Sequence, residues 1–300
     1  FGTLALTGSN VAVTENAAMD LGASTIGGTA NFNSTSNVIT DSGTLAITGA
    51  TTINAGTADI TLDQAASTFG ALALTGANVA VTENAATDLA ASTVSGTLGV
   101  TSTGAVTDSG TLAITGATTI SASGQDITLD EAASTFGTLA LTGANVAVTE
   151  NAATDLGAST VSGTFGITSG GAITDSGTQT ITGAATFTNT AGTNDAITLD
   201  DVSNAFSGTV TFSTDSGSAV TVVDTTALDL LALSAASLSV TAGGAVTDSG
   251  TLAVSGATTI SASGQDITLD EAASTFGTLA LTGSNVAVTE NAAMDLGAST

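Results

Sequence analysis

The chain has 300 residues and contains no Lys, Arg, His, Cys, Pro, Trp or Tyr, while 26 Asp and Glu residues give it a formal net charge of −26. Without His and Cys there can be no zinc finger, thiolate site or Ser–His–Asp triad. Without Lys and Arg there is no P-loop lysine and no basic surface for nucleic acid. A hydrophobic content of 42% excludes a disordered acidic tail. No run approaches 18 apolar residues, so we expect no membrane insertion.

Internal repeats organise the whole chain. The 25 residues from Phe1 to Thr25 recur unchanged at 276–300. Near copies begin at Phe69 and Phe136 and a diverged copy begins at Phe206, so the spacings are 68, 67, 70 and 70 residues. We therefore divide one continuous segment, 1–300, into units of the same pattern, at 1–68, 69–135, 136–205, 206–275 and a partial 276–300. Because the chain opens inside this pattern, we expect it to be part of a longer one.

In chain order, each repeat predicts short strands. Residues 3–7 (TLALT), 11–14 (VAVT) and 126–130 (DITLD) alternate apolar and polar side chains, which is typical of half-buried strands. Turn residues follow each run, as in DSG at 108–110 and TGAN at 142–145. The AAST stretches are too short to nucleate helices.

These strands predict an all-β fold, a right-handed parallel β-helix (β-solenoid) with about three coils per 67–70-residue repeat. A coil of roughly 22 residues gives about 13 coils in the chain. The Phe residue that opens each unit is expected in the core or at a corner. Separate small β-sandwiches are the competing architecture, and they would have weak cores without Trp, Tyr or disulfides.

Two runs in the second half carry a resemblance to a known family: GAITDSGTQTITGAATFTNTAGTNDAITLDDVSNAFSGTVTF at 171–212 and SLSVTAGGAVTDSGTLAVSGATTI at 237–260. Both resemble the long repeats of filamentous-haemagglutinin-like proteins, and the resemblance covers essentially all 300 residues. It implies a secreted, right-handed β-helical surface or matrix protein used in adhesion.

Carboxylates are the chemistry that remains. Glu15, Glu83, Glu150 and Glu290 recur in the motif VTENAA, each followed five residues later by an Asp. Paired carboxylates about 5–10 Å apart can hydrolyse glycosidic bonds. A catalytic pair is a singular feature, whereas these acids recur with the repeat, so we expect no catalytic residues and interpret the acids as solvated faces or turns.

Calcium is the stronger prediction, because hard cations prefer oxygen ligands. Adjacent acids follow the Ile-Thr-Leu runs, and the candidate ligands are Asp130, Glu131, Asp200, Asp201, Asp270 and Glu271. No other cofactor is expected. If a repeat spans three coils, identical acids lie about 14 Å apart, beyond the ~8 Å screening length, which would limit repulsion.

The sequence thus predicts the non-catalytic structural shaft of an extracellular bacterial fibre, cell-surface adhesin or biofilm matrix. The expected partners are further copies, head-to-tail or lateral, with divalent cations or cell-surface glycans as further candidates. A calcium-dependent matrix or sheath protein is the alternative, and a β-helical polysaccharide-degrading enzyme is the second alternative.

Overall fold

The computed structural model describes residues 1–190, 195–214 and 217–300. It divides into two compact units, Phe1–Glu150 and Asn151–Thr300, each described by itself below. The described residues form strands and turns with no helix, so none of them builds a helix that could cross a membrane. The predicted all-β class is confirmed.

The first unit contains 21 strands. They are β1 (Thr3–Leu4), β2 (Thr7–Gly8), β3 (Val11–Thr14), β4 (Met19–Leu21), β5 (Ser24–Ile26), β6 (Ala30–Asn33), β7 (Ile39–Asp41), β8 (Leu45–Ile47), β9 (Thr51–Asn54), β10 (Ile60–Leu62), β11 (Leu72–Gly76), β12 (Val79–Glu83), β13 (Thr87–Leu89), β14 (Ser92–Val94), β15 (Leu98–Ser102), β16 (Val106–Asp108), β17 (Leu112–Ile114), β18 (Thr118–Ser121), β19 (Ile127–Leu129), β20 (Thr138–Gly143) and β21 (Val146–Glu150).

The described part of the second unit is built in the same way. Its strands are β22 (Thr154–Leu156), β23 (Ser159–Val161), β24 (Phe165–Ser169), β25 (Ile173–Asp175), β26 (Gln179–Ile181), β27 (Ala185–Asn189), β28 (Ile197–Leu199), β29 (Ala205–Phe206), β30 (Thr209–Ser213), β31 (Ala219–Asp224), β32 (Leu228–Ala235), β33 (Ser237–Ala242), β34 (Val246–Asp248), β35 (Leu252–Ser261), β36 (Ile267–Leu269), β37 (Thr275–Thr282) and β38 (Val286–Val288).

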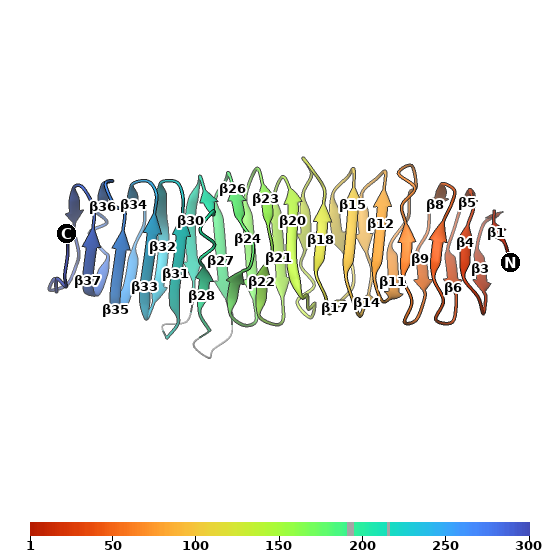
Figure 1. The fold of residues 1–300 in the computed structure, drawn as a ribbon, viewed down its shortest axis with the longest axis horizontal. Coiled ribbons are helices and arrows are strands. Elements are labelled where there is room, and N and C mark those ends of the chain that lie inside the picture. The colour runs from red at the N-terminus through yellow and green to blue at the C-terminus, as the bar shows by residue number, and fades with distance from the viewer. Residues whose placement is uncertain (191–194, 215–216) are drawn as a thin grey trace. The chain divides into compact units, whose positions relative to one another are not determined.

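Within each unit the strands stack in parallel, coil upon coil, as Figure 1 shows. In the first unit Thr3 pairs with Asp20, Asp20 with Thr40 and Thr40 with Thr61. The same column continues through Ala80, Gly99, Thr119 and Ala140. A second column runs through β3, β6, β9 and β11, and a third through β2, β5 and β8. The predicted β-solenoid is therefore confirmed, with about 14 turns in the chain.

The register refines the relation between repeat and coil. Seven pairings lead from Thr3 to Ala140, and Ala140 lies in β20, the strand two repeats after β1. The equivalent strand one repeat on, β11, lies instead in the second column, where Leu72 pairs with Thr51. The predicted three or so coils per repeat thus become seven coils for two repeats. Equivalent residues of successive repeats therefore lie in different columns of paired strands.

The interior is filled by the apolar half of each alternation. In β18, for example, Thr118 and Ile120 are buried while Thr119 is exposed. Predicted core positions are confirmed for Phe69, Phe136, Phe206 and Phe276, which are buried, whereas Phe1 is exposed. In the second unit Phe187 contacts the rings of Phe165, Phe206 and Phe212 at centroid distances of 5.7–6.0 Å.

Candidate functional site: carboxylates between the coils

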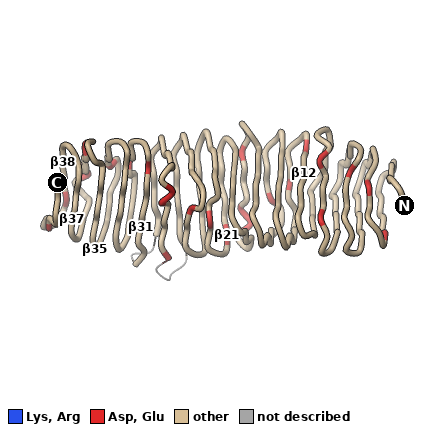
Figure 2. The backbone as a smooth tube through the Cα atoms, in the orientation of Figure 1, with Lys and Arg blue, Asp and Glu red and all other residues tan. Residues whose placement is uncertain are grey.

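The acids lie on strands and at turns of each unit, as Figure 2 shows, and several of them are buried. Glu83, the last residue of β12, is fully buried, and its Oε1 accepts the amide N–H of Phe69 at 2.7 Å. Glu150 Oε1 accepts the amide N–H of Phe136 at 2.6 Å, and Glu290 accepts that of Phe276 at 3.2 Å. Each carboxylate therefore accepts a hydrogen bond from the backbone of the Phe that opens its own repeat.

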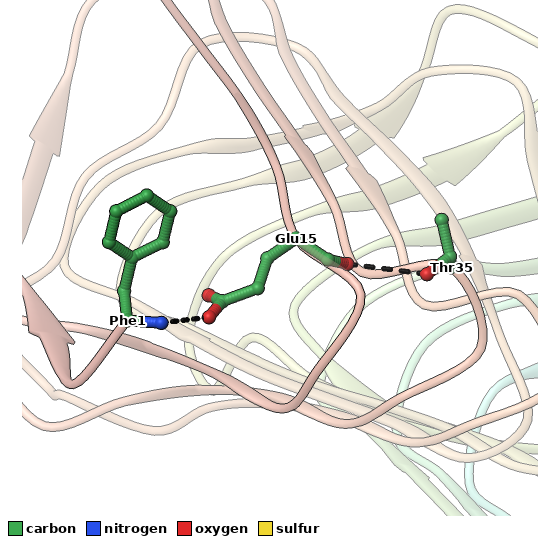
Figure 3. Close-up of polar contacts among 3 residues, drawn as sticks. All are labelled: Phe1, Glu15 and Thr35. Carbon is green, nitrogen blue, oxygen red and sulfur yellow. Dashed lines mark hydrogen bonds and ion pairs between the residues drawn. The ribbon is translucent and has the colours of Figure 1, made fainter.

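The first copy of this pair is drawn in Figure 3. The amino group of Phe1 donates to Glu15 Oε1, and the Thr35 hydroxyl donates to the backbone carbonyl of Glu15 at 3.3 Å. Thr35 belongs to the coil that follows, so Glu15 links its neighbours on both sides.

The diverged repeat keeps the same contact with a different residue. Phe206 has no Glu fourteen residues on; its amide N–H donates instead to Asp224 Oδ1 at 3.3 Å. Asp224 is buried at the end of β31 and also accepts the amide and the hydroxyl of Thr226, both at 2.9 Å. The buried acceptor for this Phe is therefore retained although its place in the sequence has moved.

A second set of buried or half-buried acids fastens the turns. The Asp of each TDSG motif accepts the amide N–H of an acid one coil further on: Asp41 from Asp63 at 2.9 Å, Asp108 from Asp130 at 2.8 Å, Asp175 from Asp200 at 2.8 Å and Asp248 from Asp270 at 2.7 Å. These bonds join successive coils at the turn after the Ile-Thr-Leu strands.

Burial dominates the protonation of these interior acids. It raises the pKa of Asp41, Glu83, Asp108, Asp175, Asp224 and Asp248, and the amide hydrogen bonds oppose the rise. The charges of Asp130 and Glu131 raise the pKa of Asp108 further. The outward-facing Asp20 behaves oppositely, because the hydroxyls of Thr3 and Ser42 lower its pKa.

The predicted calcium ligands lie at these same turns. Asp130, Asp200 and Asp270 are exposed, whereas Glu131, Asp201 and Glu271 are half-buried. The two acids of each pair are neighbours in the sequence, and the TDSG Asp of the preceding coil accepts the amide N–H of the first acid of the pair. Even so, residues 1–190, 195–214 and 217–300 hold no group of three or more His, Cys, Asp or Glu side chains arranged to hold a metal ion. Calcium binding stays a prediction.

The candidate catalytic acids do not share a cleft. Glu83 points into the core and is fully buried, whereas the partner acid Asp88 is half-buried at the outward position of β13, between the buried Thr87 and Leu89. The expectation that these Glu residues form solvated faces or turns is wrong for Glu15, Glu83 and Glu150, which are buried. A signal was available in the sequence, because Val79, Val81 and Glu83 share one phase of the strand alternation.

The expected separation of acids along the solenoid also needs correction. Identical acids are well apart, because two repeats take seven coils. Different acids nevertheless meet across one coil, since Asp108 accepts the amide of Asp130 and lies within electrostatic reach of Asp130 and Glu131. The repeat length therefore sets the distance between identical acids, but not the distance between different acids such as Asp108 and Asp130.

Comparison with known proteins identifies a repeat family. The family model described as "Repeats of unknown function (DUF5649)" matches residues 8–75, 76–142, 143–213 and 217–282. Neither the curated proteins nor the solved structures include a match. The first three matched segments begin seven residues after the Phe that opens a unit and the fourth begins eleven residues after it, so both divisions describe the same period.

Proposed function

We propose that this chain, which belongs to the DUF5649 repeat family, is a structural shaft, a non-catalytic segment of an extracellular fibre or adhesin. Its mechanism is mechanical. Coils stack through backbone hydrogen bonds, and the interior supplies cohesion along the stack.

The observation that carries this proposal is the continuity of the ladder within the first unit. Seven consecutive pairings join Thr3 to Ala140 without a break in the column. Each coil adds about 4.8 Å along the stacking direction. A module that grows by such steps suits a spacer whose length is set by the number of repeats.

The use of the acids supports a structural role. A carboxylate oxygen accepts a hydrogen bond from an amide N–H of a neighbouring segment in each of three acids, Glu83, Asp108 and Asp248. A hollow of about 360 Å³ near the last coil is lined by apolar side chains, including Leu281, Val288 and Leu296, with no acid among its lining residues. These features favour cohesion over chemistry.

The net negative charge of the chain supports an extracellular location in contact with water. Asp59, Asp126 and Asp266 are exposed, and no basic side chain in the sequence balances the 26 acids. A uniformly negative surface stays hydrated and opposes lateral bundling. Contact with further copies or with cell-surface glycans would then occur at the ends of the stack or through hydroxyl-rich faces.

Immunogold electron microscopy of the intact source cells tests the proposal. Antibodies raised against the chain should label filaments or the cell surface without permeabilisation. Labelling confined to permeabilised cells would contradict an extracellular shaft. Incubation of the purified chain with neutral and acidic polysaccharides should release no new reducing ends or unsaturated products.

A calcium-dependent matrix is the second candidate, favoured by one observation. Acids of two coils lie at one turn there, since the Asp108 carboxylate accepts the amide N–H of Asp130 at 2.8 Å and that of Glu131 at 3.4 Å. If calcium crosslinks neighbouring molecules, a chelator should disperse the assemblies and added Ca²⁺ should restore them. Assemblies that keep their lateral packing in a chelator would leave the shaft as a calcium-independent structure.

A further inference from the structure

Glu83 is a buried acid that does not belong to the predicted calcium ligands. It also shares no cleft with Asp88, its partner in the candidate catalytic pair. It ends β12 with its side chain fully buried, in phase with the buried Val79 and Val81. Its Oε1 accepts the Phe69 amide at 2.7 Å, and it pairs with Ser102 of β15. Its Oε2 is also buried and accepts no hydrogen bond from any residue that the structure describes.

No positive side chain can balance this carboxylate, because the sequence has no Lys, Arg or His. The titratable groups on the elements around it are also acids: Asp63 in the turn after β10 and Asp88 on β13, while β15 has none. Thr87 has a single hydroxyl hydrogen, and its hydroxyl lies 3.1 Å from Ser102 Oγ. A buried charge in such surroundings is strongly disfavoured, and the usual response is protonation.

The fold does not require a charged acceptor for this task. Elsewhere in the same unit, neutral hydroxyls accept equivalent buried amides: Ser67 from Leu45, Ser92 from Leu74 and Ser134 from Leu112, each at 3.0 Å. An acid at position 83 therefore adds one property that Ser lacks, which is the capacity to take up a proton.

We propose that Glu83 is a proton-binding site inside the solenoid, and that proton uptake there stabilises the coil joining Phe69 to Glu83. Burial raises the pKa of Glu83, and the hydrogen bond from the Phe69 amide opposes the rise only in part. The folded-state pKa therefore lies above the unfolded one. The stability from this group is fully present below the ordinary Glu value of 4.5 and is lost as the pH rises through the folded value.

Carboxyl-selective NMR on the full chain tests the site directly. The sequence holds only six Glu residues, so labelling Glu at Cδ with ¹³C gives six signals. The Glu83 signal, identified by its absence in Glu83→Gln, should titrate with a midpoint above 4.5. A Glu83 midpoint at or below 4.5 would overturn the proposal. If Glu83→Gln fails to fold, triple-resonance assignment of the unmodified chain gives the same answer.

Stability measurements supply an independent readout. Between its unfolded and folded pKa values, one such group changes the unfolding equilibrium constant by up to tenfold per pH unit. Glu83→Gln, which keeps the acceptor oxygen and cannot ionise, should remove up to that much of the pH dependence. Asp126→Asn is the matched control, because Asp126 is exposed and its carboxylate accepts hydrogen bonds from Asn145. Equal pH dependence in Glu83→Gln and the unmodified chain would refute a proton site at Glu83.

Discussion

Replacing Gly49 by Ala would insert a methyl group between two stacked turns of the first unit. Gly49 donates its amide N–H to the carbonyl of Gly28 at 3.0 Å, one coil earlier. A Cβ on Gly49 would lie 2.6 Å from both the carbonyl carbon and the carbonyl oxygen of Gly28, and 3.0 Å from the amide nitrogen of Thr29. Since these are backbone atoms, relief requires the coils to separate.

The expected cost follows from this geometry. Overpacking a well-filled site costs about 1–3 kcal/mol, and the lost hydrogen bond adds roughly 1 kcal/mol. Gly49→Ala should therefore lower the free energy of unfolding by about 2–4 kcal/mol. Gly27→Ala is the matched control, because a Cβ there has no atom within 4 Å. It should be neutral or stabilise by roughly 0.4–1 kcal/mol through the unfolded chain.

Urea denaturation followed by far-UV circular dichroism compares the two variants with the unmodified chain. The reasoning requires a clear loss for Gly49→Ala beside a small or favourable change for Gly27→Ala. Equal midpoints for the two Ala variants would refute the close approach of Gly28 and Gly49, and with it the register of the stacked turns.

Further predictions concern the core, the turns, pH and metal ions. Ile120→Ala, in a fully buried site between Val100 and Leu141 of the neighbouring coils, should lower the free energy of unfolding by about 2–5 kcal/mol, and a loss below 1 kcal/mol in urea titration would speak against a packed interior. Asp108→Ala leaves the Asp130 amide without its acceptor and should cost roughly 1–3 kcal/mol, whereas Asp108→Asn retains the acceptor oxygen; equal losses would show that this bond is unimportant. Thermal melting should give a higher midpoint at pH 4.5 than at pH 8, because stability from carboxyls whose folded pKa is raised is lost as pH rises, and the opposite order would contradict their burial: Asp41, Glu83, Asp108, Asp175, Asp224 and Asp248. If calcium is not structural, a chelator should leave the midpoint of thermal unfolding at pH 7 unchanged. A lower midpoint in the chelator would instead support the predicted sites at Asp130, Asp200 and Asp270.

Much of the fold could be predicted from alternation and repetition. The strand pattern of Leu72, Leu74 and Gly76 is visible in the sequence, and the structure buries all three. The number of coils per repeat was less accessible, because coil lengths vary: 17 residues separate Thr3 from Asp20, but 21 separate Thr40 from Thr61. Small differences of this kind decide whether the next repeat returns to the same sheet.

The burial of the interior acids could not be predicted from residue type alone. Acids usually face water, which predicts a solvated face for Glu83, although its phase with Val79 and Val81 indicates the core. Burial becomes tolerable through a bond to Phe69, fourteen residues earlier in the chain. That partner is invisible locally and follows only once the coil between the two residues is closed.

The most direct test of the central claim is the length of fibres built from a shortened chain. Deleting residues 4–138 joins Thr3 to Leu139 in the same repeat phase and removes seven coils. Electron micrographs of cells carrying this variant should show surface filaments shorter by roughly 34 Å for each copy of the chain along the filament, at ~4.8 Å per coil. Two results would contradict a structural shaft. One is filaments of unchanged length, and the other is cells in which no filament contains this protein.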